Sequence, residues 1–314
     1  MDILAVCPNP SVDVTVSAEK IEAGSLNRIP PPVITRSGKA INALKAAAIL
    51  GARGVASGFM FSNDADGFAD DLKGYGCSSD FVVLKGDVRR NIKLCERGGK
   101  LTELNSAGAP VGEAEKAALL KKIGELSERR AVTVVSGSLP PGCESGYYGE
   151  LSRAVKSRYK LIDAEGDRLI SALSSGATLV KPNAEEAAKI VGFAVDSVRA
   201  AVAAGKVIVG MGAEIALISL GKGGAVITDG VTAFFAKAPE VEVGSPVGAG
   251  DSMVGAAAAA LSRLDGAINE DAMRMILRDA AAAGSASVMS EGTRLFGMSG
   301  FKRTLELVTV RKAE

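Results

Sequence analysis

The feature that most constrains the fold of this chain is an alternation of short apolar runs with longer amphipathic segments. The first run, ILAVC within residues 2–7, stops before Pro8, which is typical of a buried strand. Further candidate strands are residues 55–59, 81–84, 131–137, 160–163, 178–181 and 215–219, with a hairpin at 224–236. Within residues 37–52, a Gly-bearing turn is expected to enter a helix that ends at Gly51. The other expected helices are residues 64–75, 113–129, 145–157, 167–174, 184–191, 196–205 and 251–264, with a last one at about 270–289. This order predicts an α/β fold with a doubly wound, mostly parallel sheet flanked by helices.

Two β-rich stretches interrupt this alternation, residues 12–36 and 88–104. The first combines the alternating VDVTV with a Gly24-Ser25 break and three successive prolines, and the second is interpreted as a hairpin that turns at Gly98-Gly99. Two separated insertions of this kind have to pair with each other, so we expect a small β-sheet that stands off the main domain as a lid. No other boundary is visible, and residues 1–314 are expected to form one domain.

Composition and charge exclude several classes of protein. The chain has 314 residues, of which 47% are hydrophobic and 23% are charged, as in a globular chain with a large core. It has 37 basic and 36 acidic residues and no basic tract, so nucleic acid is not an expected partner. The longest apolar run, Val254 to Leu261, is too short to span a bilayer, and the N-terminal segment lacks a basic stretch. We therefore expect a cytoplasmic protein with no membrane partner.

The residue types that are missing limit the chemistry. The chain contains no histidine, which excludes a Ser-His-Asp triad, a Cys-His pair and histidine-ligated metal sites. The cysteines are widely spaced without a C-x-x-C motif, and they are interpreted as reduced structural thiols: Cys7, Cys77, Cys95 and Cys143. A general base must therefore be a carboxylate, Lys, Tyr or Cys.

A glycine-rich turn within residues 243–264 delivers one carboxylate, Asp251, to the start of an alanine-rich helix. Glycines at 244, 248 and 250 allow the backbone a positive φ and a close approach to a ligand, while the free N–H groups of the helix point into the turn. Such a turn binds anions, and a carboxylate beside it suits base-assisted phosphoryl transfer. The alternative is that Asp251 only caps the helix.

Polar motifs follow several expected strands, at the edge where open α/β sheets bind ligands. Asp13 lies in NPSVD after the first strand, and the loop SGSLPPG, residues 136–142, follows a later one. Lys39 and Asn42 open a helix three residues apart, so both can face a ligand. This segment is not a Walker A loop, because its G-K pair is followed by Ala and lacks the upstream glycine. Caps, turns and solvated side chains explain these residues equally well.

Two further motifs suggest a nucleotide and its metal ion. KPNAEE places Asn183 and Glu186 one helical turn apart, where Glu186 can hold a hydrated Mg²⁺ or, equally, complete a capping box. The turn SLGKGGA, residues 219–225, can admit the phosphates or ribose of a nucleotide. Neither this turn nor GAGDSMVG has the G-x-G-x-x-G spacing, so a dinucleotide fold is disfavoured.

The second lid segment places three polar residues on one face of a strand. Arg89, Asn91 and Lys93 alternate in sequence and therefore share a face. The alternative is that these residues protect an exposed edge from aggregation.

Taken in order, NPSVD, SGKAIN, RRNIK, SGSLPPG, KPNAEE, SLGKGGA and PVGAGDS resemble the motifs of the ribokinase-like (PfkB) carbohydrate kinases. The chain is most similar to the branch that contains 1-phosphofructokinase, tagatose-6-phosphate kinase and the minor 6-phosphofructokinase. The resemblance covers nearly the whole chain. It implies an α/β domain with a β lid, ATP as the donor, Mg²⁺, a small sugar phosphate as the acceptor, and a homodimer formed through the lid.

The resemblance also implies roles for individual residues. Asp251 matches the catalytic base, and the transferred phosphoryl group is bound by Gly248, Ala249 and Gly250. The positions that match acceptor-binding residues are Asp13, Gly38, Lys39, Asn42, Arg89, Lys93 and Ser138, with Arg89 on the phosphate. The positions that match nucleotide-binding residues of the family are Lys181, Asn183, Ser219, Gly221 and Gly224. Glu186 matches the residue that binds Mg²⁺ through water.

Three departures from the family pattern lie around the acceptor. Ser37 and Ala40 stand where the phosphosugar branch usually has the glycines of GGKGIN, and Val88 replaces a usual Thr. Where the family has D-x-S-G, this chain has DAEG at residues 163–166. Fructose 1-phosphate is the expected acceptor, giving fructose 1,6-bisphosphate. Tagatose 6-phosphate, fructose 6-phosphate, an unphosphorylated sugar or a nucleoside are the alternatives within kinases, and a sugar-phosphate-binding protein without catalysis is the alternative outside them.

Overall fold

The computed structural model describes residues 2–97, 101–245, 247–290 and 295–313. The main sheet is built from β1 (Ile3–Cys7), β4 (Gly54–Phe61), β5 (Ser78–Ser79), β6 (Val82–Leu84), β9 (Val132–Ser136), β10 (Tyr159–Asp163), β11 (Ala177–Val180), β12 (Ala213–Ser219), β13 (Ala225–Thr228), β14 (Ala233–Ala236) and β15 (Val310–Lys312). Its order is β15-β14-β13-β12-β11-β10-β9-β1-β4-β5, and β6 also pairs with β4. Pairing is parallel as far as β12 and antiparallel from β12 to β15, so the predicted mostly parallel sheet is confirmed.

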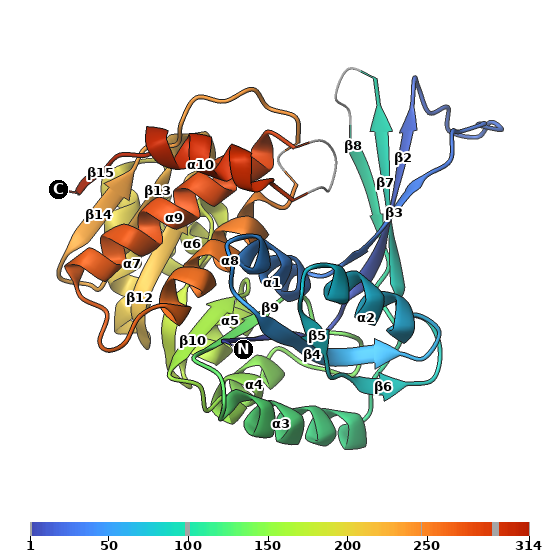
Figure 1. Ribbon diagram of the computed structural model, residues 1–314, viewed down its shortest axis with the longest axis horizontal. Coiled ribbons are helices and arrows are strands. Elements are labelled where there is room, and N and C mark those ends of the chain that lie inside the picture. Colours follow the sequence, from blue (N-terminus) through green and yellow to red (C-terminus); the bar gives the residue numbers. More distant parts are fainter. Residues whose placement is uncertain (1, 98–100, 246, 291–294, 314) are drawn as a thin grey trace.

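Helices cover both faces of this sheet (Figure 1). One face carries α1 (Lys39–Ile49), α2 (Ala65–Gly74), α8 (Ala249–Ser262), α9 (Glu270–Val288) and α10 (Met298–Leu307). The other carries α3 (Glu113–Ser127), α4 (Tyr147–Ala154), α5 (Asp167–Leu173), α6 (Ala184–Val191) and α7 (Val198–Gly210). Successive residues of β1 feed the two layers alternately, because neighbouring side chains of a strand point to opposite faces. None of the described helices is long and apolar enough to cross a membrane.

The alanine-rich helix α8 packs between α1 and α9. Its residues from Ser252 to Leu261 are buried, and the absence of large side chains lets α1 approach closely. A Cβ on Gly255 would lie only 2.3 Å from Ala43 O. This tight packing fixes the first turn of α8, which carries Asp251, relative to α1 and to the ends of the parallel strands.

Within residues 37–52, helix α1 begins at Lys39, after the turn at Gly38 that follows β3 (Val33–Ser37). The chain departs from the expected elements at two helices. Helix α7 continues through Gly205 instead of ending there. A Cβ on that glycine would lie 2.4 Å from Thr228 Cγ2, so the residue allows close packing against β13 and does not stop the helix. Helix α9 is not the last element, because α10 and β15 follow it and β15 pairs with β14.

A second, separate sheet has the order β3-β2-β7-β8 and stands off the main body (Figure 1). Its remaining strands are β2 (Ser11–Ala18), β7 (Arg89–Glu96) and β8 (Leu101–Asn105). Strands β2 and β7 come from the two expected insertions and pair in parallel along their whole length. The predicted small sheet is therefore confirmed, whereas the turn predicted at Gly98-Gly99 lies outside the described residues.

Candidate active site

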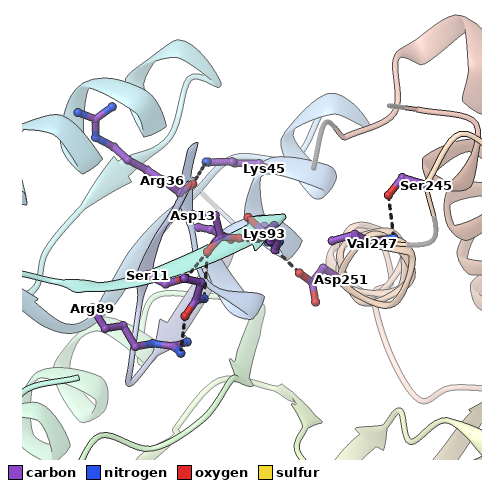
Figure 2. Close-up of polar contacts among 12 residues, drawn as sticks. Ser11, Asp13, Arg36, Lys45, Arg89, Lys93, Ser245, Val247 and Asp251 are labelled. Atoms are coloured by element: carbon purple, nitrogen blue, oxygen red, sulfur yellow. Dashed lines mark hydrogen bonds and ion pairs between the residues drawn. The ribbon is translucent and has the colours of Figure 1, made fainter. Parts of the chain in front are cut away.

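Asp251 lies in the first turn of α8, beside the end of α1 that follows the small sheet. The N-cap of α8 is Gly248, whose φ of 83° is in the left-handed region that favours glycine, so Asp251 is not the helix cap. Asn42 Nδ2 of α1 donates to Asp251 Oδ2 at 2.8 Å. Figure 2 shows Asp251 projecting from α8 toward the polar cluster of the small sheet. The carboxylate is therefore held in place and directed away from its own helix.

The electrostatic surroundings of Asp251 suit a base. Burial raises the pKa of Asp251 from 3.8 to about 6, although the hydrogen bond from Asn42 lowers it. The charge of Asp163 raises this pKa further, and the charges of Lys39 and Lys181 lower it. A carboxyl group with a pKa near 6 is ionised at neutral pH and still accepts a proton more readily than an ordinary Asp. These are the properties that a general base requires.

A buried carboxylate, Asp163 at the end of β10, organises the cations of the site. Lys181 Nζ lies 3.2 Å from Asp163 Oδ1, Lys39 Nζ lies 4.0 Å from Asp163 Oδ2, and Ser136 Oγ donates to Oδ2 at 2.7 Å. Burial raises the pKa of Asp163, but these lysines and the serine outweigh it and hold the pKa below its usual value. A Cβ on Gly250 would lie 3.6 Å from Lys181 Nζ. A lysine thus stands beside the N-terminal turn of α8, an arrangement that suits an anion.

Asp13 of β2 is the centre of a hydrogen-bonded cluster in the small sheet. This buried carboxylate accepts three hydrogen bonds, from Ser11 Oγ at 2.9 Å, Asn91 Nδ2 at 3.0 Å and Lys93 Nζ at 2.9 Å (Figure 2). Asn91 and Lys93 reach it from one face of β7, as their alternation in sequence predicts. Lys93 is therefore engaged with Asp13, and the pair carries no net charge when both groups are ionised.

Arg89 connects the same face of β7 to the loop that follows β1. Its Nε and Nη2 donate to Asn9 O at 3.2 and 3.1 Å, and its Nη1 donates to Asn91 Oδ1 at 3.3 Å and Ser106 O at 3.4 Å. Burial lowers the pKa of Arg89 below its ordinary value. Asn9 in turn donates to Ser138 Oγ at 3.2 Å, which brings the loop after β9 to this site.

The start of α6 lies beside the glycine-rich turn that follows β12. Asn183 N donates to Glu186 Oε2 and Glu186 N donates to Asn183 Oδ1, both at 2.9 Å, so the capping-box alternative is present. Asn183 also forms an isolated parallel bridge with Ser219. Gly224 has a φ of 108°, and a Cβ there would lie 2.0 Å from Ala236 O. Only glycine fits this position without displacing the strand beside it.

An apolar cleft of about 610 Å³ opens beside this turn. One end is formed by the turn after β12 and the other by the first turn of α8, and the walls come from α9 and the segment 237–243. Its lining includes Ser219, Gly221, Gly224, Pro239, Val241, Val243, Ala249, Gly250, Met253, Ala281 and Val288. A cleft with apolar walls and a helix N-terminus at one end fits a heterocycle whose phosphates point at α8.

Comparison with known proteins decides the family. Residues 9–298 match the model of the pfkB family carbohydrate kinases. The chain is 32% identical over 266 residues to 1-phosphofructokinase of Bacillus subtilis, covering 83% of this chain and 86% of that protein. It is 34% identical over 274 residues to 1-phosphofructokinase of Haloferax volcanii, covering 87% and 88%. The chain belongs to the pfkB family of carbohydrate kinases. It is therefore an ATP-dependent sugar kinase, as its motifs predict.

Solved structures of the family agree with this assignment. The crystal structure of phosphofructokinase-2 from Escherichia coli in complex with potassium gives a TM-score of 0.88 at 28% identity and covers 98% of both chains. The same enzyme in complex with fructose 6-phosphate gives a TM-score of 0.87 at 27% identity, again covering 98% of both chains. The ribokinase-like fold of this pfkB kinase is thus confirmed over almost its full length.

The predicted site residues of this pfkB kinase gather at one edge of the main sheet. Around the start of α8 lie Lys39, Asn42, Lys181, Gly248, Ala249, Gly250 and Asp251. Next to the small sheet lie Asp13, Gly38, Arg89, Lys93 and Ser138. At the cleft and the start of α6 lie Asn183, Glu186, Ser219, Gly221 and Gly224. Their positions agree with one site, and their individual roles remain predictions.

Three groups of the site were not expected from the sequence. Asp163 is the centre of the lysine cluster, Asn9 links the small sheet to the loop after β9, and α9 supplies one wall of the cleft. A signal for Asp163 existed, because this residue follows a buried strand at the carboxyl edge, as Asp13 does. The wall from α9 had no signal, because its alanines and glycine are typical of any tightly packed helix.

Proposed function

We propose that this pfkB kinase transfers the γ-phosphoryl group of ATP to the 6-hydroxyl of fructose 1-phosphate, which forms fructose 1,6-bisphosphate and ADP. The relatives named 1-phosphofructokinase support this acceptor. The observation that carries the proposal is the carboxylate of Asp251, which Asn42 holds beside the anion-binding start of α8. A protein that only bound a sugar phosphate would have no need of a positioned base at that point.

In the proposed reaction Asp251 is the general base. Its carboxylate takes the proton of the acceptor hydroxyl as the hydroxyl oxygen attacks the γ-phosphorus, and ADP leaves on the opposite side. The backbone N–H groups at Gly248, Ala249 and Gly250 are placed to stabilise the charge that develops on the transferred group. Lys181, beside Gly250, adds a positive charge at the same point.

The acceptor side of the proposed site lies between the small sheet and α1. In this proposal Asp13 and Asn42 contact sugar hydroxyls, and Arg89 contacts the phosphate that the acceptor already carries; their positions at one edge of the sheet support these roles. In this arrangement the small sheet acts as the lid. Tagatose 6-phosphate and fructose 6-phosphate are the competing acceptors, and relative kcat/KM values for the three sugar phosphates and for free fructose distinguish them.

Mg²⁺ is the metal ion that we propose for ATP binding. The described part of the chain contains no group of three or more Asp, Glu, Cys or His side chains that could hold a metal directly. This fits Mg²⁺, which keeps several waters and is commonly held by substrate phosphates and one or two carboxylates. Glu186, half-buried at the start of α6, would be that carboxylate and would act through water. When bound, the ion neutralises part of the charge of the phosphates.

A homodimer formed through the small sheet is also proposed. The face of this sheet that lies opposite Asp13 carries a row of apolar side chains in register across all four strands: Ile34, Val14, Ile92 and Leu104. Ile34, Ile92 and Leu104 are 60%, 37% and 54% exposed. A continuous apolar row on an exposed sheet is typical of an interaction surface, and a second copy of the chain would cover it.

The substitution Asp251→Asn tests the general base. The amide keeps the size of the side chain and loses the proton acceptor, so we expect kcat to fall roughly 10²- to 10⁴-fold with the affinity for ATP nearly unchanged. ADP release with fructose 1-phosphate gives kcat, and calorimetry gives ATP binding. Asp279→Asn is the matched control, because burial also raises the pKa of Asp279, which lies on α9 and pairs with Arg263. A variant at 251 that keeps more than about a tenth of the turnover would remove this role, provided that chemistry limits the rate.

A further inference from the structure

The junction between the small sheet and α1 is held in a fixed position. Ser37 is the last residue of β3 and is still paired with β2. At the next residue, Gly38, a Cβ would lie 2.6 Å from Cys7 Sγ, so the backbone rests directly on the end of β1. From the second turn of α1, Lys45 Nζ donates to Arg36 O at 2.7 Å (Figure 2). The buried side chain of Ser37 therefore occupies a defined position beside α1.

One nitrogen atom of Asn42 connects Ser37 to Asp251. Asn42 Nδ2 donates to Asp251 Oδ2 at 2.8 Å and to Ser37 Oγ at 3.2 Å. An amide nitrogen carries two protons, so both bonds form at once. The carboxylate can only accept, so it determines which way round the amide lies, and the hydroxyl holds the amide plane at a second point.

We propose that Ser37 is a positioning residue for the base Asp251 and that it acts through Asn42, an inference that rests on the proposed function. The terminal torsion of an Asn side chain is broad and allows the amide to swing unless both ends are held. The Ser37 hydroxyl restricts this motion and keeps an N–H directed at Asp251 Oδ2. Without the hydroxyl, the amide retains one partner at this nitrogen, and its bond to the carboxylate loosens.

The pH dependence of the reaction carries the signature of this arrangement. The charged groups that face Asp251 are Asp163 from β10, Lys39 from α1 and Lys181 after β11, and a change at Ser37 alters none of them. The amide hydrogen bond lowers the pKa of Asp251, so loosening it raises that pKa. A base works only when deprotonated, and the acid limb of the rate profile therefore moves to higher pH.

The test compares Ser37→Ala, Asn42→Ala and the double variant, with kcat measured against pH at saturating ATP and fructose 1-phosphate. Because the hydrogen bond from Asn42 is loosened and not removed, the acid limb of Ser37→Ala is expected to shift upward by about half a pH unit. Activity then falls about threefold at pH 5 and is unchanged at pH 8. The wild type and the variants are assayed with the same substrates. Titration of the substrate phosphates therefore affects every rate profile equally and does not contribute to the difference between them. In the Asn42→Ala background, Ser37→Ala adds no further effect.

A matched control and two contrary outcomes complete the design. Ser152→Ala is the control, because it removes another buried hydroxyl: Ser152 lies in α4, and its Oγ donates to Gly176 O at 3.1 Å. This variant should leave the acid limb of the rate profile in place. An unshifted limb in Ser37→Ala, or an effect that persists without Asn42, overturns the proposal and leaves the general base intact. A rise in KM for fructose 1-phosphate with no shift of the limb also overturns it, because the hydroxyl then contacts the acceptor. If Asp251→Asn keeps its turnover, the proposed function fails, and this inference fails with it.

Discussion

At the scale of single residues, Arg89 has a structural and a proposed functional task. Its guanidinium donates twice to Asn9 O in the loop after β1, which links the small sheet to the main domain, and also to Asn91 Oδ1 of β7 and to Ser106 O just after β8. Arginine has five N–H donors in a rigid fork, so one N–H, on Nη2, is left for a phosphate while these four bonds persist. Loss of Arg89 therefore has two possible consequences, and an experiment has to separate them.

Arg89→Ala should raise KM for fructose 1-phosphate roughly 10- to 150-fold, because a charge-assisted contact in a closed site is worth about 1.5 to 3 kcal/mol. The weak activity on free fructose should barely change, since that substrate has no phosphate to lose. The control is Arg90→Ala, because Arg90 is the next residue on β7 and pairs with Asp64 with 48% of its side chain exposed. Equal losses on both substrates would show that Arg89 is only an anchor of the small sheet.

Sequence reasoning at this scale found the residues but not their contacts. The positions of Asp251 and Asn42 follow from motifs that open α8 and α1, because a helix start fixes where its first side chains lie. The ion pairs of Asp163 depend on the ends of β10 and β11 meeting the start of α1 at one edge, and the hydrogen bond from Asn42 to Ser37 depends on two side-chain rotamers. Neither is specified by spacing in the sequence.

At the scale of elements, the start of α6 combines helix capping with a proposed metal site. The capping box uses Glu186 Oε2 to accept the N–H of Asn183. A carboxylate has a second oxygen, so the same side chain can also accept a hydrogen bond from a water of hydrated Mg²⁺. The two interpretations of this motif are therefore compatible, and they predict different responses to one substitution.

Glu186→Gln should raise the Mg²⁺ concentration for half-maximal rate about tenfold or more, because outer contacts of a metal site typically contribute 10- to 100-fold to its affinity. Thermal stability should change little, since Gln also completes a capping box. Rate measured against Mg²⁺ and a thermal melt give both readings. Ser197→Ala is the control, because Ser197 Oγ caps α7 by accepting from Ala200 N. Ser197→Ala should lower the free energy of unfolding by about 1 kcal/mol and leave the Mg²⁺ dependence of the rate unchanged. A fall in stability alone in the Glu186 variant would make this residue a cap and nothing more.

Most elements of the main domain were predictable because each buried strand is a continuous apolar run. The failures have local causes. Gly205 was interpreted as a helix end, but its missing side chain makes room for Thr228. The strand β15, three residues of Val310–Lys312, is too short and too polar for any pattern to indicate it, and it forms only because β14 offers an edge.

At the scale of the whole molecule, the small sheet has two faces with different tasks. Parallel pairing of β2 with β7 places Asp13 opposite Asn91, and the next pair, Val14 with Ile92, points to the other side. One face therefore carries Asp13 and Asn91, and the other carries the apolar row. The existence of this sheet was predictable from two insertions that needed partners. Its register was not, because a shift of one residue would exchange the two faces.

The substitution Ile92→Glu tests the proposed dimer. Ile92→Glu places a charge at the centre of the apolar row, and burying it against a second copy would be strongly unfavourable. We expect the wild-type chain to sediment as a dimer at micromolar concentration and the variant as a monomer. Val231→Glu is the control, because Val231 is 88% exposed in the turn after β13, remote in sequence from the small sheet.

If the small sheet needs its partner to stay closed, dissociation of Ile92→Glu should also raise KM for fructose 1-phosphate, because β7 carries Ile92 on one face and Arg89 and Lys93 on the other. The affinity for ATP should hold, since the cleft is lined by α8, α9 and the strand turns of the main domain. A wild-type chain that stays monomeric at every concentration would contradict the interface. A monomeric variant with an unchanged KM would keep the interface and show that the sheet closes over the acceptor without help from a second copy.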